Sequence, residues 1–240
     1  MVELEHEHTV EAIAERIASA NHNYIRDFIY GGVDGAVTTF AVVSGVAGAE
    51  LSTKIVLILG FANLAADGFS MAASNFLGTR AEIDDYRRIE KIEHRHIELA
   101  PEGEREEVRE IYRAKGFKGE ELEKAVELIT ADKDRWVKTM LTEEYGLPNE
   151  IRSPWLAAGS TFSAFVICGL VPLLPYLFGT NGTFLVACVM TGITFFLIGS
   201  FKSRWSTHTW YRSGLETLFV GALAAGLAYG VGVLLKGIAG

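Results

Sequence analysis

The sequence predicts an all-α, polytopic membrane protein with five transmembrane helices and a charged helical insert between the second and the third. Of the 240 residues, 49% are hydrophobic, yet about two thirds of the acidic and basic residues fall between positions 77 and 153. Five apolar stretches flank this charged block, and each has about 19 to 24 residues, enough for a helix to cross a hydrocarbon core of about 30 Å. The stretches are residues 28–49, 55–77, 155–178, 183–201 and 215–235.

These stretches divide the chain into four predicted segments. Residues 1–27 form a cytoplasmic amino-terminal segment, 28–77 the first two membrane helices, 78–153 a cytoplasmic glutamate-rich domain and 154–240 the last three membrane helices. The first segment is acidic and lacks the basic region and apolar core of a secretory signal. Apolar residues recur in it at helical spacing, which indicates an amphipathic helix lying on the membrane surface or a solvated helix. They are Val10, Ile13, Ile17 and Ala20.

The first apolar stretch contains an acid, Asp34, in the run GGVDGAVTTFAVVSGVAGAE. Small residues share its helix face, and such a face lets another helix approach closely. These residues are Gly31, Thr38, Ala41, Gly45 and Gly48. Packing explains the glycines but not the carboxylate, which costs at least about 2.5 kcal/mol in hydrocarbon. Asp34 therefore indicates an ion or proton path.

The second apolar stretch carries a polar ridge, because Asn63, Asp67, Met71 and Asn75 are spaced four apart. Such a ridge must face protein or a wet cavity. Carboxylate oxygens combined with a thioether favour a first-row transition metal over Mg²⁺ or Ca²⁺. The alternative is that the amides and acids only hold helices together while Met71 fills space.

The second helix is predicted to continue into the insert, because no proline occurs from Ile55 to Glu98. At about 1.5 Å per residue it would be about 65 Å long. Glu90, Glu93 and His96 are three apart on this helix, and Glu-x-x-His is a spacing that can bind a transition metal.

Two later helices of the insert also align candidate ligands. A helix beginning at Pro101 places Glu104 and Glu107 on one face, and a final helix carries Met140 and Glu144 four apart. The alternative is a solvated surface whose charges form pairs between residues four apart.

Basic residues in the connections predict the orientation. Residues 201–213 contain Lys202, Arg204 and Arg212, whereas the connection at 49–54 has one lysine and that at 179–182 has no basic residue. The positive-inside rule then places the insert and the amino terminus in the cytoplasm. The net charge of -8 argues against a nucleic-acid partner and suits cations. Cys168 and Cys188 lie in apolar stretches, where buried free thiols are expected.

Several segments resemble the vacuolar iron transporter family, in a prokaryotic-type form. The resemblance runs from about residue 26 to 232 and is carried by RDFIYGGVDGAVTTFAVVSGVAGA, DGFSMAASNFLGTRAE, the glutamate-rich insert and LVPLLPYL. It implies a homodimer of five-helix subunits in a lipid bilayer, which exchanges Fe²⁺, and often Mn²⁺, for protons. The membrane would be the cell (inner) membrane, or a vacuolar membrane in a eukaryote.

The resemblance also assigns site residues in the membrane. It places Asp34 and Met71 on the metal-coordinating positions of a path at the dimer interface, where the small-residue face of Asp34 would lie. Asn63 stands where plant and fungal members have a glutamate, and we expect Asp67, one turn later, to supply that charge.

In the insert, the resemblance assigns metal binding to Glu93, Glu104, Glu107, Met140 and Glu144. His96 stands where plant members have another glutamate. Because imidazole binds metals only when neutral, the affinity would fall below about pH 6.5. We expect no permanently bound cofactor, with Fe²⁺, Mn²⁺, Co²⁺ or Zn²⁺ as substrates and insert-bound ions.

Two other classes of protein are weighed against a transporter. A membrane-anchored ferroxidase or storage protein would use paired Glu-x-x-His motifs, but the insert has one. A non-transporting metal sensor would not need Asp34, Asp67 and Met71 in the membrane. No nucleophile elbow, phosphate loop or cysteine pair indicates catalysis. The sequence therefore predicts a transporter and not an enzyme.

Overall fold

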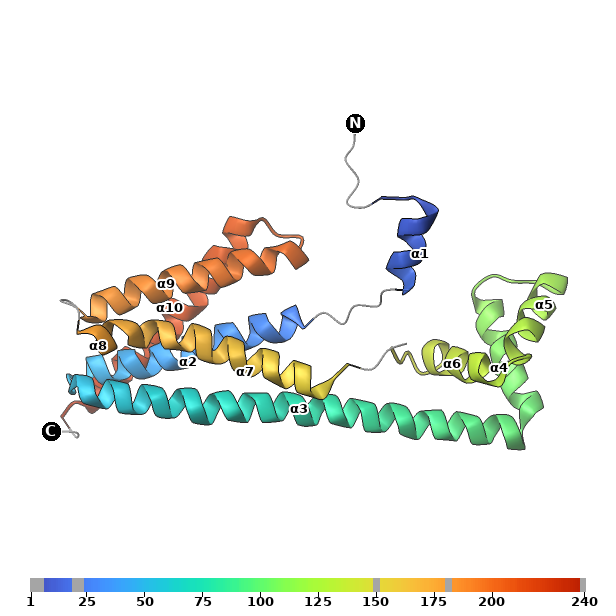
Figure 1. Ribbon diagram of the computed structural model, residues 1–240, viewed down its shortest axis with the longest axis horizontal. Helices are drawn as coiled ribbons and strands as arrows, with labels where there is room; N and C mark the ends of the chain where they lie inside the picture. Colours follow the sequence, from blue (N-terminus) through green and yellow to red (C-terminus); the bar gives the residue numbers. More distant parts are fainter. Residues whose placement is uncertain (1–6, 19–23, 149–151, 180–182, 238–240) are drawn as a thin grey trace. The chain divides into compact units, whose positions relative to one another are not determined.

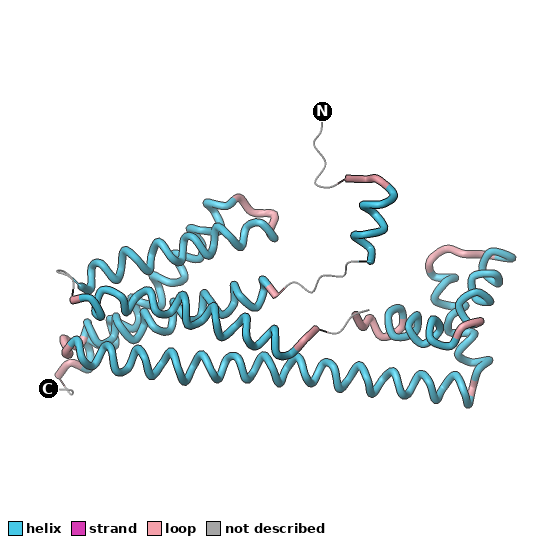
Figure 2. Tube along the Cα trace, viewed as in Figure 1, coloured by secondary structure: helices cyan, strands magenta, loops and turns pink. Residues whose placement is uncertain are grey.

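The computed structural model describes residues 7–18, 24–148, 152–179 and 183–237, and this part of the chain is built of helices without strands (Figures 1 and 2). The chain divides into two compact units. The insert unit comprises Met1–Asn21 and Gly78–Arg152, and the membrane unit comprises His22–Leu77 and Ser153–Gly240.

Five helices are long and apolar enough to cross a membrane, which confirms the predicted number of spans. They are α2 (Ile25–Gly48), α3 (Thr53–Leu99), α7 (Pro154–Leu170) continuing into α8 (Leu174–Phe178), α9 (Thr183–Lys202) and α10 (Trp210–Leu235). The third span is broken by a 3₁₀ turn at Val171–Leu173. Pro172 and Pro175 cause the break, because proline has no backbone N–H for the helix ladder.

Helix α2 packs closely against α7 and α10 through glycines. A Cβ atom on Gly31 would overlap the carbonyl oxygen of Thr161 in α7, and one on Gly48 would overlap that of Tyr229 in α10. Only glycine permits such backbone contact. The expectation that the small-residue face around Asp34 lies at a dimer interface is therefore wrong for these glycines, since helices of the same subunit already occupy them.

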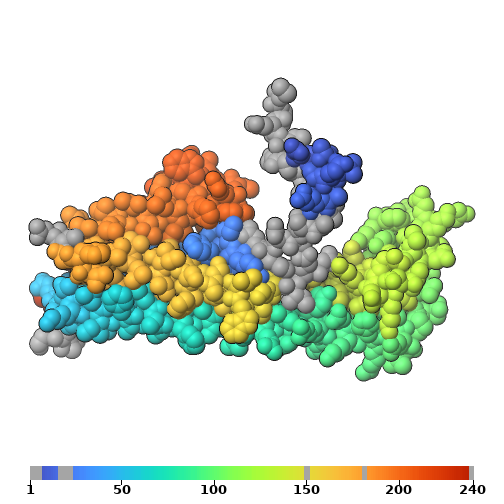
Figure 3. Space-filling model, viewed as in Figure 1, coloured from blue at the N-terminus to red at the C-terminus, as the bar shows by residue number. Residues whose placement is uncertain are grey.

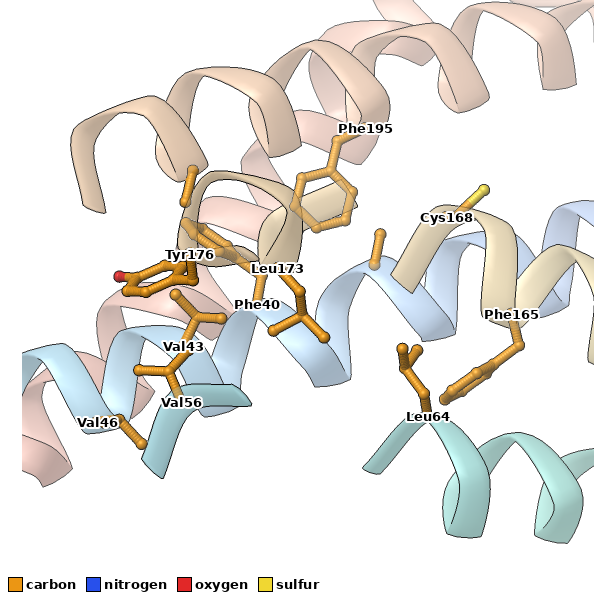
Figure 4. Close-up of a cluster of buried hydrophobic side chains, with 12 residues drawn as sticks. Phe40, Val43, Val46, Val56, Leu64, Phe165, Cys168, Leu173, Tyr176 and Phe195 are labelled. Carbon is orange, nitrogen blue, oxygen red and sulfur yellow. The ribbon is translucent and has the colours of Figure 1, made fainter. Parts of the chain in front are cut away.

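The core of the membrane unit is apolar and draws on helices far apart in sequence (Figure 4). Phe40 of α2, Leu64 of α3, Phe165 of α7 and Phe195 of α9 are all buried there. Helix α7 lies beside α3 (Figure 3), where the rings of Phe76 and Trp155 are 4.6 Å apart. Both cysteines are free thiols, with Cys168 buried and Cys188 half-buried.

The insert unit packs the end of α3 against α4 (Pro101–Ala114), α5 (Gly119–Thr130) and α6 (Lys133–Glu143). Its core includes Val108, Val126 and Trp136. Helix α3 is unbroken over 47 residues, about 70 Å at 1.5 Å per residue, which confirms that the second span continues into the insert. The amino-terminal segment contains helix α1 (Val10–Ala18), while Ala20 lies outside the described residues.

Candidate functional site

Two polar stripes face one another on α2 and α3. On α2, Asp27, Asp34 and Thr38 share a face, because they are seven and four residues apart. The stripe on α3 is the predicted ridge. The two helices run antiparallel, so their residues meet in three pairs, which we call the polar ladder: Thr38 with Asn63, Asp34 with Asp67, and Asp27 with Asn75.

The first pair of the polar ladder is a hydrogen-bonded contact. The side-chain amide of Asn63 donates from Nδ2 to Oγ1 of Thr38 at 3.2 Å and to Oγ1 of Thr39 at 3.3 Å. Thr38 in turn donates to the backbone carbonyl of Asp34 at 2.9 Å. Asn63 thus anchors α3 to α2 one turn from Asp34, and as a neutral amide it adds no charge.

The middle pair brings together two acids. Asp34 is half-buried, Asp67 is exposed, and the two carboxylates are close enough to repel one another. Among the described residues neither of them forms an ion pair. Met71, one turn beyond Asp67 on α3, is half-buried against the apolar core. This arrangement offers oxygen ligands with unbalanced negative charge beside a thioether.

The third pair contains a residue that sequence reasoning missed. Asp27 is only 7% exposed, and its Oδ1 accepts a hydrogen bond from Nδ2 of Asn75 at 3.0 Å. The same nitrogen donates to Oγ1 of Thr161 at 2.7 Å and to the carbonyl of Ala157 at 3.3 Å, both in α7. The available signal was the seven-residue interval between Asp27 and Asp34, which places both acids on one helix face.

The insert unit buries two carboxylates, Glu93 of α3 and Glu104 of α4. Their exposed fractions are 1% and 5%, although glutamate is almost never fully buried without a partner. One oxygen of each, Oε2, has no hydrogen-bond partner among the residues that the structure describes. Buried acceptors left in this state are costly, and a cation or a proton would satisfy them.

Four glutamates of the insert lie close enough together for their charges to repel one another. Burial, together with the charges of Glu107, Glu93 and Glu144, raises the pKa of Glu104 to about 7. Burial also raises the pKa of Glu144, again with help from Glu107 and Glu93. We call Glu93, Glu104, Glu107 and Glu144 the carboxylate cluster. Like charges held together in this way favour proton or cation binding.

A histidine and a tyrosine adjoin the carboxylate cluster. Nδ1 of His96 lies 3.3 Å from Oε1 of Glu104 and 3.9 Å from Oε1 of Glu93. The hydroxyl of Tyr145 donates to Oε1 of Glu93 at 3.1 Å. Burial and this hydrogen bond raise the pKa of Tyr145, so the phenol stays a donor. Sequence reasoning missed Tyr145, whose only signal was its position directly after Glu144.

The remaining predicted ligands are Met140, whose backbone carbonyl accepts hydrogen bonds from the N–H groups of Glu144 at 2.9 Å and Tyr145 at 3.4 Å, and Glu90. Met140 is 0% exposed and packs in the apolar core of the insert with Trp136 and Leu141. Glu90 is half-buried beside Tyr86, where burial and the charge of Glu90 raise the pKa of the phenol. In the described part of the chain, no three His, Cys, Asp or Glu side chains converge as metal ligands would. A metal ion in the carboxylate cluster would therefore need side-chain rotations.

A model of the VIT family matches residues 25–233 of the sequence. This chain belongs to the VIT family. It is 33% identical over 238 residues to a vacuolar iron transporter of Toxoplasma gondii, covering 94% of this chain and 79% of the relative. It is 34% identical over 210 residues to vacuolar iron transporter 1 of Arabidopsis thaliana, covering 85% and 83%.

A rice relative extends the same likeness. Vacuolar iron transporter 2 of Oryza sativa subsp. japonica is 31% identical over 217 residues, covering 89% of this chain and 88% of the relative. The family match and the five apolar helices together identify an integral membrane protein, and the family is one of transporters rather than enzymes. The resemblance drawn from the sequence motifs is confirmed.

Proposed function

We propose that this protein transports Fe²⁺ across the membrane in exchange for protons, with Mn²⁺ as a second substrate. Relatives of this chain are named vacuolar iron transporters. The observation that carries the proposal is the middle pair of the polar ladder, in which Asp34 and Asp67 face one another beside Met71. Intramembrane acids of this kind mark ion paths.

Exchange follows from competition for the same oxygens. Two carboxylates with no basic partner among the described residues repel each other in a medium that solvates charge poorly. A divalent cation relieves that repulsion when it binds both, and protons relieve it when the cation leaves. Metal binding and proton binding therefore exclude one another at Asp34 and Asp67, which is the physical basis of antiport.

The sulfur of Met71 supports a transition-metal substrate. Mg²⁺ and Ca²⁺ take oxygen ligands, whereas a thioether adds affinity for softer first-row ions. Asn63 is held by two threonine hydroxyls, so its amide nitrogen already has acceptors. We assign the charge of the path to the two aspartates and treat Asn63 as the residue that orients α3.

The carboxylate cluster of the insert would collect ions for the path. Oε2 of Glu93 and Oε2 of Glu104 lack hydrogen-bond partners within the described ranges, and His96 adds a nitrogen ligand at the exposed side. Fe²⁺, Mn²⁺, Co²⁺ and Zn²⁺ all accept such mixed oxygen and nitrogen ligands. The bound ions would be cargo, held reversibly because the glutamates also bind protons.

The path requires a second subunit. Asp67 is exposed on α3, within a stretch long and apolar enough to cross a membrane. Lipid against this carboxylate would be costly, so another protein surface must cover it. Gly31 and Gly48 of α2 already pack against α7 and α10 of the same subunit. We therefore propose a homodimer joined through the Asp67 face of α3, with the path between the subunits.

A second candidate is a membrane-anchored iron-storage or sensor protein. The observation that favours it is that the carboxylate cluster belongs wholly to the insert unit, so metal binding there needs no transport. Such a protein would bind Fe²⁺ without moving it. A flux measurement separates the two functions.

The test is Fe²⁺ uptake by liposomes that contain the purified full-length protein and a trapped fluorescent chelator, with and without a pH gradient. We expect uptake that the gradient accelerates and that the Asp34→Asn variant loses. The double variant Glu93→Gln/Glu104→Gln should still transport at high Fe²⁺ concentration. Metal binding without uptake by the parent protein would instead establish the storage or sensor function.

A further inference from the structure

The membrane unit contains a cleft of about 370 Å³ between α2, α9 and α10. Its lining is almost wholly apolar and draws on all three helices. The lining residues used below are Phe40 and Ser44 of α2, Cys188 and Phe195 of α9, and Gly226 and Tyr229 of α10. A site of this size and polarity suits an apolar ligand with few polar atoms.

The cleft is open along one side. Ala222 and Gly226 of α10 line it and are exposed. A Cβ atom added to Gly226 would meet no atom within 4 Å, so the missing side chain leaves empty space. Both residues belong to a span predicted to lie in the bilayer, so the open side faces hydrocarbon.

The few polar groups of the cleft gather at one end. Ser44 lies four residues before the end of α2, Cys188 five residues after the start of α9, and Tyr229 six residues before the end of α10. Figure 1 shows these helix ends together. The apolar rings of Phe40 and Phe195 lie further along the helices, toward the middle of the spans (Figure 4).

The hydroxyl of Ser44 is unsatisfied. Ser44 is 1% exposed, and its Oγ has no hydrogen-bond partner in the described part of the chain. A buried hydroxyl in this state is costly, and a ligand with a hydrogen-bond acceptor at that end of the cleft would remove the cost. The apolar lining of the cleft requires a ligand that is apolar along its length, and the Ser44 hydroxyl independently requires a hydrogen-bond acceptor at one end of it.

We propose that the cleft binds one acyl chain of a diacyl glycerolipid, whose ester carbonyl accepts a hydrogen bond from Oγ of Ser44. The bilayer supplies such chains at the open side. Ser44 is four residues, or about 6 Å along the axis, from the end of α2, and ester groups lie at the edge of the hydrocarbon core. The site is separate from the polar ladder, since Ser44 lies about 80° around α2 from Asp34.

The first experiment fills the cleft. Gly226→Leu places a side chain in the empty space, and the matched control is Gly230→Leu, one turn later on α10, where an added Cβ also meets nothing within 4 Å. Both changes raise helix propensity equally, but Gly230 does not line the cleft.

The readout is native mass spectrometry of the full-length protein in detergent after addition of dioleoylphosphatidylcholine. The parent and Gly230→Leu should each retain one lipid per chain. Gly226→Leu should retain about tenfold less, because the leucine side chain would overlap the acyl chain and overpacking costs at least that much. Equal lipid retention by the two variants overturns the proposal. The proposal also fails if Gly226→Leu loses a dimer peak and keeps its lipid, because the cleft would then be a contact between subunits.

The second experiment tests the hydrogen bond. A dialkyl ether phosphatidylcholine has the same chains without the ester carbonyl. The parent should prefer the diacyl lipid by about fivefold, the value of one neutral hydrogen bond, and Ser44→Ala should bind both lipids equally. A parent that does not distinguish the two lipids overturns the assignment of Ser44.

Discussion

The two acidic sites of this protein hold their charges in different ways. In the membrane unit, Asp34 and Asp67 repel one another with no ion pair to either among the described residues, and Asp67 is exposed on an apolar span. In the insert, Glu93 and Glu104 are buried, and Tyr145 and His96 adjoin them. We infer that protonation and polar neighbours stabilise the buried glutamates of the insert. We propose that a bound cation and a second subunit offset the repulsion of the membrane pair.

The largest effect should come from the membrane pair. Asp34→Asn removes a titratable charge while keeping the shape, so we expect Fe²⁺ uptake to fall by at least about 100-fold, as for loss of an essential ligand. The variant should be at least as heat-stable as the parent in detergent, because a neutral amide is less costly in the membrane than an unpaired carboxylate. Liposome flux and thermal melting provide the two readouts.

A control acid sharpens this first prediction. Glu50 lies at the end of the same span and pairs with Lys236 at 2.5 Å, outside the polar ladder. Glu50→Gln should leave uptake close to the parental rate. Near-parental uptake by Asp34→Asn would mean that Asp34 only holds helices together.

The carboxylate cluster should affect affinity more than maximal rate. We expect Glu93→Gln/Glu104→Gln to reduce the number of Mn²⁺ ions bound to the full-length protein and to raise KM for uptake about tenfold while kcat changes little. Calorimetry and flux titrations measure these quantities. The control is Glu121→Gln/Glu127→Gln, which changes two exposed glutamates of α5. Equal effects of the two double variants would show that only the total negative charge of the insert matters.

A smaller effect should appear in the pH dependence of the metal-free insert. The pKa of Glu104 is raised from 4.5 to about 7, so the folded state binds its proton more tightly than the unfolded state. The stability from this proton is complete below about pH 4.5 and is lost as the pH rises through 7. The melting temperature in chelator should therefore be higher at pH 5.5 than at pH 7.5, measured on full-length protein in which Trp136 is the one fluorophore after Trp155, Trp205 and Trp210 are replaced by phenylalanine.

Two further melts test the cause of that shift. Glu104→Gln should lose most of the difference between pH 5.5 and pH 7.5. Added Mn²⁺ should raise the melting temperature of the parent at pH 7.5, because the cation takes the place of the proton. A pH difference that persists in Glu104→Gln would assign the effect to other groups.

The smallest effect should come from the thioether of the path. Met71→Leu keeps the volume and apolarity but removes the sulfur, so uptake of Fe²⁺ and Co²⁺ should fall severalfold more than uptake of Mn²⁺. Met190→Leu in α9 is the matched control, since Met190 is also half-buried in a span. Equal, small losses for all three metals in Met71→Leu would leave Met71 with a packing role only.

Local patterns in the sequence were enough to predict several features. Hydropathy identified the five spans, and the absence of proline predicted that α3 would continue into the insert. The four-residue spacing of Asn63, Asp67 and Met71 placed them on one face, and that spacing is a property of any helix. These predictions succeed because each depends on residues within a few turns of one another.

Contacts between distant segments were decided only by the tertiary structure. Gly31 and Gly48 face α7 and α10 because those helices approach the backbone of α2, which no local pattern specifies. Asp27 meets Asn75 across 48 residues, and Tyr145 meets Glu93 across 52. Met140 is in the apolar core although its spacing from Glu144 predicted a ligand, since burial depends on which helices pack around α6. Helical periodicity assigns a residue to a face, but the packing of the other helices determines what that face contacts.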